Sequence, residues 1–318
     1  MCTMNRESYY LAAILTLITV AGTFPYQTVA QTCSCAGVPL LSSQDMANSR
    51  AGQWNFSLTY EYHDVSDLYS NDKKLENRSF QRSTQSLLAE VNYGITDRLL
   101  ATGLLSSTRK VRKSGPSLGN EVTATGIGDG LVMLKYTLHQ NTIQEQYQLT
   151  VGGGTKIPLG PTDLSGPITA LSPDMQPSTG SWDIVGWGQI SKTFLPTTTL
   201  NAFATVSYRH TGTHDFSNLE NFKFGNQLVA KLGVSNSFLD RFEYTLIGKY
   251  RHVSIFEFNG NERPNTGGDW INVIPGLNYT ISSNMSARIA GEFPVCRYLN
   301  GTQSTTNYSA SVSLFYSF

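Results

Sequence analysis

The chain has little charge and no excess of either sign. Of its 318 residues, 23 are basic and 23 are acidic, so the formal net charge is zero. A neutral balance argues against a nucleic-acid partner, which would favour a basic surface. Charged residues make up only 14% of the chain, whereas a typical soluble domain has roughly 25%. An ordinary soluble protein is therefore disfavoured.

The chain also lacks an apolar run long enough for a membrane helix. Its longest run, residues 11–24, has 14 residues, whereas a membrane helix needs about 20. The run follows Arg6 and precedes the small residues around Ala30, which is the pattern of a secretory signal peptide. We expect cleavage near residue 30 and export, with an uncleaved anchor as the alternative.

Cysteine is scarce, with four residues in the chain. Cys2 lies in the predicted signal peptide, which leaves Cys33, Cys35 and Cys296. Three cysteines cannot all pair within one exported chain, and a disulfide between Cys33 and Cys35 would be strained. The residues before Cys33 do not form a lipid-attachment signal. The sequence therefore leaves the redox state and role of these cysteines open.

What the chain does have is a two-residue alternation, which is clearest over residues 306–318. One parity is apolar and the other is mostly serine; the apolar members are Tyr308, Ala310, Val312, Leu314, Tyr316 and Phe318. Successive strand side chains point to opposite faces. This pattern is typical of a strand in a transmembrane barrel, apolar towards lipid and polar towards the lumen. We interpret Tyr316 and Phe318 as an insertion signal for the barrel-assembly machinery.

Eleven earlier segments repeat or tolerate this alternation, and most have about the length that a tilted strand needs to cross a bilayer. They lie at residues 54–62, 87–93, 98–108, 129–138, 147–157, 181–194, 200–209, 222–234, 242–251, 271–280 and 285–293. The parity of residues 98–108 and 181–194 is ambiguous. Twelve strands in total fit a single-chain bacterial barrel, whose strand number is even.

The connections between these segments alternate between short and longer ones. Short turns such as residues 94–97 and 281–284 alternate with polar loops such as 64–83, 109–124 and 159–180. Outer-membrane barrels have tight periplasmic turns and longer extracellular loops. Outward aromatic residues also fall at two levels, as interfacial girdles do; the extracellular level is expected to include Phe222 and Phe224.

The predicted fold is therefore all-β: a transmembrane antiparallel up-and-down β-barrel of about twelve strands, with short periplasmic turns and longer extracellular loops. We expect a signal peptide at residues 1–30, a periplasmic extension or plug at 31–52, and the barrel at 53–318. The expected location is the outer membrane of a bacterium.

Charged residues gather on the inward parity of the predicted strands. They are Glu61, Glu90, Asp129, Lys135, Lys156, Arg209, Lys231, Glu243, Lys249, Arg251, Arg288 and Glu292. A lysine or arginine facing lipid at mid-membrane would cost about 2–4 kcal/mol, so these side chains must face the interior. They could line a wet pore or pair with one another as a polar core. Lys231, Lys249 and Arg251 are the stronger pore candidates.

Other chemistries have weaker support. The glycines at residues 126–130 and 152–156 resemble phosphate-binding loops but open no helix. His210 and His214 would share a face only on a helix, so we expect no metal site. An enzyme that modifies lipids would need a paired serine and histidine, and the spacing of Ser207, Ser217 and His210 does not indicate one. The sequence thus predicts no catalytic residue and no cofactor.

Three stretches carry a family resemblance. They are TGIGDGLVMLKYTL at residues 125–138, GGTKIP at 153–158 and MQPSTGSWD at 175–183. Over residues 85–318 the chain resembles the phenol-degradation meta-pathway (MetA-like) family of outer-membrane channels. Ser178 departs from the glycine that is usual in the third stretch. The resemblance implies an outer-membrane barrel that transports aromatic or hydrophobic compounds, and it implies no catalytic residues.

The sequence therefore predicts a passive outer-membrane channel for small molecules, including aromatic or apolar ones, and not an enzyme. Its expected partners are outer-membrane lipid, the barrel-assembly machinery and a small solute. A structural or adhesive barrel without a pore, and a lipid-modifying enzyme, are the alternatives. A plug formed by residues 31–52 predicts that their deletion changes the single-channel conductance.

Overall fold

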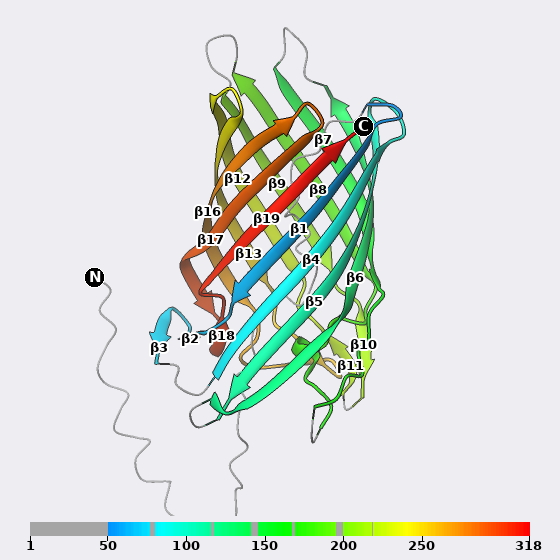
Figure 1. The fold of residues 1–318 in the computed structure, drawn as a ribbon. Coiled ribbons are helices and arrows are strands. Elements are labelled where there is room, and N and C mark those ends of the chain that lie inside the picture. The colour runs from blue at the N-terminus through cyan, green and yellow to red at the C-terminus, as the bar shows by residue number, and fades with distance from the viewer. Residues whose placement is uncertain are drawn as a thin grey trace, which may run out of the picture.

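The computed structural model describes residues 50–76, 80–115, 118–140, 146–166, 169–194, 200–217 and 219–318. The predicted signal peptide and most of the predicted plug lie outside these residues. In the described part of the chain, twelve strands form one closed barrel (Figure 1). In pairing order, they are β1 (Trp54–Asp64), β19 (Tyr308–Ser317), β17 (Met285–Leu299), β16 (Gly268–Ser282), β13 (Phe242–Val253), β12 (Gln227–Leu239), β9 (Leu200–His210), β8 (Asp183–Phe194), β7 (Tyr147–Pro158), β6 (Asn120–His139), β5 (Leu99–Ser114) and β4 (Phe80–Gly94).

Every pair of neighbouring barrel strands is antiparallel, and neighbours in the barrel are also neighbours along the chain. The exception is the pair of β1 and β19, which closes the barrel over the register from Asn55↔Ser317 to Asp64↔Tyr308. The amides of Trp54 and Phe318 each donate to the other residue's carbonyl oxygen, at 3.0 Å. The up-and-down barrel of twelve strands is therefore confirmed.

The alternation sorts side chains between the two faces of the barrel. In β1, Trp54, Leu58 and Tyr60 are exposed on the outer face, whereas Thr59 and Glu61 are buried on the inner face. The same outward series of large apolar residues continues through β6, β13 and β19. Exposed apolar side chains in a continuous belt would be unfavourable in water and are suited to lipid. No helix among the described residues is long and apolar enough to cross a membrane.

The two ends of the barrel differ. At one end, residues 240–241 and 283–284 join neighbouring strands directly. At the other end, β5 and β6 pair as far as Ser114↔Asn120, so most of the predicted loop 109–124 is a projecting hairpin. The polar alternation of residues 109–124 is compatible with paired strands as well as with the predicted loop. Figure 1 shows this hairpin at the opposite end from the chain's carboxy-terminus.

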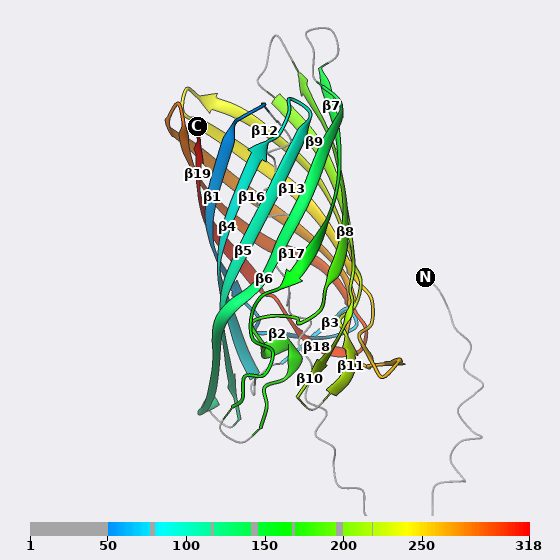
Figure 2. The same ribbon diagram turned by 90° about the vertical axis from the view of Figure 1, so that its right-hand side faces the viewer.

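Two small sheets lie at the long-loop end (Figure 2). One contains β18 (Thr302–Thr305), β2 (Asp67–Ser70) and β3 (Lys73–Leu75), and the other contains β10 (Thr213–Phe216), β11 (Leu219–Lys223), β14 (Glu257–Phe258) and β15 (Asn261–Glu262). Phe222 and Phe224 pack here with Phe216, Phe256 and Trp270 in a buried cluster. Their prediction as outward girdle residues is therefore wrong, because β11 belongs to this separate sheet.

In the connection between β7 and β8, residues 171–181 fold into the barrel instead of out into solvent. Their single-turn 3-10 helix, η2 (Pro173–Met175), is followed by the buried residues Gln176, Ser178 and Thr179. The Gln176 side chain holds the segment together. Its amide accepts from the Leu164 backbone N–H at 3.0 Å and donates to the Leu164 and Leu171 carbonyls at 2.9 and 3.1 Å. We call residues 171–181 the inner loop.

Candidate functional site in the barrel lumen

A cavity of about 170 Å³ lies inside the barrel, lined by side chains from ten of the twelve barrel strands. The strands that do not contribute are β7 and β8, whose connection forms the inner loop. Pro177 of that loop lines the cavity. The inner loop therefore occupies one side of the lumen and leaves the other side hollow.

All twelve charged residues predicted to face inward lie on the inner face of the barrel, but only some of them line the cavity. Eight of the twelve line the cavity: Glu61, Asp129, Arg209, Lys231, Lys249, Arg251, Arg288 and Glu292. The other four, Glu90, Lys135, Lys156 and Glu243, lie outside its lining. Asn92 donates to Glu90 at 2.7 Å, and Asn278 donates to Glu243 at 3.1 Å. The structure therefore brings eight of the predicted residues to the cavity and holds the other four elsewhere on the inner face.

The first wall of the lumen, here called the packed wall, is built from Leu88, Leu104, Asp129, Leu131, Met133, Lys156, Asp183, Val185 and Trp187. At its centre, the fully buried Lys156 ammonium lies 3.1 Å from both Asp129 Oδ2 and Asp183 Oδ2. Burying charges is favourable only when they are closely paired and hydrogen-bonded. Asp183 also lies 3.7 Å from Arg209 Nε, which links the packed wall to the next strand.

The inner loop is anchored on the packed wall by charge-assisted hydrogen bonds. Ser178 Oγ donates to Asp129 Oδ1 at 2.5 Å, and the Thr179 hydroxyl donates to Asp129 Oδ2 at 2.7 Å. Lys156 also donates to the Thr179 hydroxyl oxygen. Hydrogen bonds to charged groups are stronger than neutral ones. The loop is thus fixed at the same ion cluster that fills this side of the barrel.

A second set of contacts holds the start of the inner loop. Arg82, whose side chain is fully buried, donates from Nη1 to Asp174 Oδ2 and from Nη2 to the Asp174 carbonyl, both at 2.7 Å. Lys110 donates to the Gln176 carbonyl at 2.6 Å. These cations come from β4 and β5, whereas Asp129 and Lys156 come from β6 and β7, so four strands of the packed wall hold the loop. These contacts fix the position of the inner loop inside the barrel.

Apolar side chains complete the packed wall. Leu88, Leu104, Leu131, Met133, Val185 and Trp187 form one buried cluster on the inner faces of β4, β5, β6 and β8. The Lys135 ammonium lies 5.0 Å from the centre of the Trp187 ring. This geometry supports a cation–π contact. Lys135 therefore covers the cluster instead of lining the cavity.

The opposite wall, here called the open wall, carries a run of cations. Arg209 of β9, Lys231 of β12, and Lys249 and Arg251 of β13 occupy inward positions on three adjacent strands. Lys231 and Lys249 are direct partners in the register of β12 and β13. Directly opposed side chains on one sheet face lie about 4.5–5.5 Å apart at Cβ, and like charges there are destabilising. The open wall thus concentrates positive charge.

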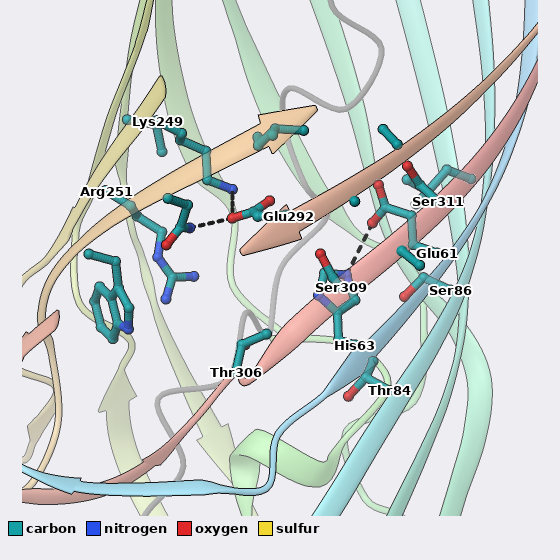
Figure 3. A pocket seen from close by; sticks show the side chains of 18 of the residues that line it. Glu61, His63, Thr84, Ser86, Lys249, Arg251, Glu292, Thr306, Ser309 and Ser311 are labelled. Carbon is teal, nitrogen blue, oxygen red and sulfur yellow. Dashed lines mark hydrogen bonds and ion pairs between the residues drawn. The ribbon is translucent and has the colours of Figure 1, made fainter. Parts of the chain in front are cut away.

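Two contacts partly offset this charge. Glu292 of β17 lies 2.5 Å from the Lys249 ammonium and also accepts from the Asn272 amide. Arg251 stacks over the Trp270 ring at 4.1 Å, since the two residues are register partners. Figure 3 shows Lys249 and Arg251 approaching Glu292 from one side of the cavity. Arg288 donates from Nη2 to the Thr245 hydroxyl at 3.2 Å.

On the side of the cavity formed by β1 and β19, Glu61 and His63 are the titratable lining residues. The His63 Nε2 atom lies 3.3 Å from Glu61 Oε2, and Figure 3 places both near Ser309 and Ser311 of β19. The serine face predicted from residues 306–318 is therefore part of the cavity wall. Small hydroxyl side chains leave space and offer hydrogen bonds to a solute or to water.

The geometry does not assemble the catalytic group considered above. Ser207 lines the cavity, whereas His210, three residues later on the same strand, is exposed on the outer face. Positions three apart on a strand point to opposite faces, so these two side chains cannot act as nucleophile and base together. No group of three or more histidine, cysteine or acidic residues in the described ranges is arranged to hold a metal ion.

The predicted insertion signal lies at the closing seam. Tyr316 and Phe318 are both exposed on the outer face, and the Phe318 ring stacks with Phe56 of β1 at 5.7 Å. Their role in assembly stays a prediction. Cys296 is a free thiol, exposed on β17, whereas Cys33 and Cys35 lie outside the described residues.

Among solved structures, an outer-membrane channel from Pseudomonas putida F1 matches with a TM-score of 0.69 at 12% identity, over 87% of this chain and 100% of that chain. This chain has the fold of an outer-membrane β-barrel. At such low identity, the similarity establishes the fold alone.

Two other solved barrels are less similar. The NanC porin has a TM-score of 0.47 at 11% identity, over 82% of this chain and 98% of its own. The β domain of the Bordetella autotransporter BrkA also has a TM-score of 0.47, at 12% identity, over 85% of this chain and 100% of its own. No family model and no curated protein matches the chain.

Proposed function

We propose that the protein is an outer-membrane channel for the passive passage of small molecules, including aromatic or apolar ones. The observation that carries this proposal is the cavity inside the barrel, with polar and charged side chains on its wall. A barrel that served only as a scaffold would gain stability by filling this space, as the packed wall does. The apolar outer belt supports a location in the bilayer.

The proposal extends the predicted family relationship. The stretch at residues 175–183, which resembles the phenol-degradation meta-pathway family, forms the end of the inner loop and the start of β8. That placement supports a role for the motif in shaping the lumen. Membership of the MetA-like group, and a solute of aromatic type, are parts of this proposal.

The function is tested by blocking the cavity. Ser311 lines the cavity, and its neighbour Val312 is exposed on the outer face. We expect Ser311→Trp to reduce solute uptake into proteoliposomes and single-channel current by most of the wild-type value, because the ring fills the cavity. Val312→Trp, which adds the same ring towards lipid, should leave both unchanged.

Heat-modifiable migration on a denaturing gel shows that each variant is folded before flux is compared. If folded wild-type protein passes no solute, the barrel is structural and the channel proposal is wrong. If Ser311→Trp and Val312→Trp conduct equally, the passage does not run through this cavity. Hydrolysis of lipid by the folded protein would instead support the enzyme alternative.

A further inference from the structure

We propose that the open wall is a binding site for small organic carboxylates that have an apolar body about the size of one ring. This inference rests on the proposed channel function for its biological use, but the binding itself can be measured separately. It names a ligand class by two properties of the cavity: its charge and its apolar lining.

The charge of the cavity is the first step. Six lysine and arginine side chains line it, against three carboxylates, so its wall has an excess of three positive charges. The carboxylates are Glu61, Asp129 and Glu292, and each lies against a basic group: His63, Lys156 and Lys249 respectively. A low-dielectric wall with one sign of charge attracts the opposite ion. The field therefore favours an anion.

The arrangement of the cations is the second step. Lys231 and Lys249 are paired on the adjacent strands β12 and β13. Arg251 pairs with Val229, which is two positions from Lys231 on β12. Opposed like charges on a sheet are destabilising, and sequences commonly violate such rules at functional sites. Glu292 already offsets part of this charge at Lys249, and a bound carboxylate between these side chains would add further charge-assisted hydrogen bonds.

Arg209 provides a third and independent observation. Its side chain is only 8% exposed, and its Nε and Nη1 atoms have no hydrogen-bond partner. The nearest acid, Asp183, is 3.7 Å from Nε and is shared with Lys156. Leaving buried donors of a charged group unsatisfied is costly. An anion in the adjoining cavity would lower that cost by approaching the guanidinium.

The apolar lining defines the rest of the ligand. Val229, Ile247, Trp270 and Ile274 lie among the cations of the open wall. The volume of about 170 Å³ is close to that of an engineered apolar cavity of about 150 Å³ that binds benzene. The cavity therefore matches a single ring together with one carboxylate. A small inorganic anion would satisfy the charge but leave the apolar lining unused.

The experiment measures binding to full-length, folded protein in detergent by isothermal titration calorimetry. The probes are benzoate, benzyl alcohol, benzylammonium and acetate, which separate charge from ring. We expect benzoate to bind about tenfold or more tightly than benzyl alcohol, since one charge-assisted hydrogen bond has about this effect. Benzoate should also bind more tightly than acetate, because acetate has no ring to bury against the apolar lining. Benzylammonium should bind least.

Lys231 is the residue to change. Lys231→Gln should weaken benzoate binding by about tenfold and leave benzyl alcohol binding unchanged, whereas Lys231→Arg should preserve both affinities. The matched control is Lys192→Gln, since Lys192 is exposed near the short-turn end of β8 and does not line the cavity. This control should bind benzoate as wild type does.

The outcomes separate this inference from the channel proposal. Equal affinity for benzoate and benzyl alcohol, or equal loss of both in Lys231→Gln, would overturn the carboxylate site even if the barrel conducts. Selective benzoate binding to a barrel that passes no solute would support the site and contradict the channel. Equal binding of acetate and benzoate would show that the anion alone is recognised and the ring is not.

Discussion

The packed wall and the open wall have the same origin in sequence but opposite organisation. Both are built from inward positions of alternating strands, and both carry lysine, arginine and carboxylate side chains. On the packed wall, Lys156 has two carboxylates at 3.1 Å and the inner loop covers them. On the open wall, Lys231 and Lys249 are opposed and border a cavity. Inward charge is thus paired and covered on one side of the barrel, whereas on the other side it borders an open cavity.

The largest expected effect comes from breaking the packed wall. Asp183→Asn removes one of the two carboxylates that neutralise Lys156 and also the acid beside Arg209. Removing one partner of a buried ion pair commonly costs about 3–5 kcal/mol. We expect a loss of this order in the free energy of unfolding, measured from the urea dependence of heat-modifiable migration. Asp163→Asn, at an exposed position of the same β7–β8 connection, is the matched control and should change stability little.

A smaller effect is expected from a change at Gly180 that moves the inner loop away from the packed wall. Gly180 has φ of +73°, and a Cβ atom there would lie 2.2 Å from His214 Cδ2. Gly180→Ala therefore strains the loop and pushes it and the His214 ring apart. We expect higher single-channel conductance together with a stability loss of about 1–3 kcal/mol.

Gly260→Ala is the control for backbone strain. Gly260 has a similar φ of +74°, but nothing lies within 4 Å of its added Cβ atom. It should reproduce the strain without changing conductance. If both variants conduct like wild type, the inner loop does not limit the lumen, and the contrast between the two walls has no effect on flow.

The smallest effect is expected from a substitution that increases the charge difference between the two walls. Glu292→Gln removes the carboxylate 2.5 Å from Lys249, so the cavity gains one positive charge with little change in shape. We expect a moderate rise in the permeability of chloride over potassium, measured from the reversal potential in a salt gradient. Glu243→Gln, on the inner face but outside the cavity lining, should shift the potential less. An equal shift would show that the local charge of the open wall does not control selectivity.

Strand parity was predictable because lipid and lumen impose opposite demands on successive residues. Trp54, Leu58, Thr59 and Glu61 lie on the faces that their alternation predicts. The parity of residues 98–108 was ambiguous because Leu100 and Leu104 point inward and are buried, so both faces of β5 are partly apolar. The apolar infill of the packed wall removes the contrast on which the prediction depends.

The inner loop could not be predicted from local pattern. Residues 171–181 have no two-residue period, and their burial depends on Arg82, Lys110 and Asp129, which are far away in sequence. The error at Phe222 and Phe224 has a related cause. Their alternation continues in phase with β12, but the chain leaves the barrel and forms β11 in a separate sheet. The short motif at residues 175–183 was the only signal near the loop.

The seam between β1 and β19 also determines when the barrel can form. Thr59 donates to Ser313 across this seam at 2.9 Å, although the two residues are 254 positions apart. Contacts between such distant residues slow folding, and until they form, both terminal strands are open edges that can pair with another chain. An exported chain must therefore be kept from its neighbours until its last strand arrives. The barrel closes when the first and last strands meet.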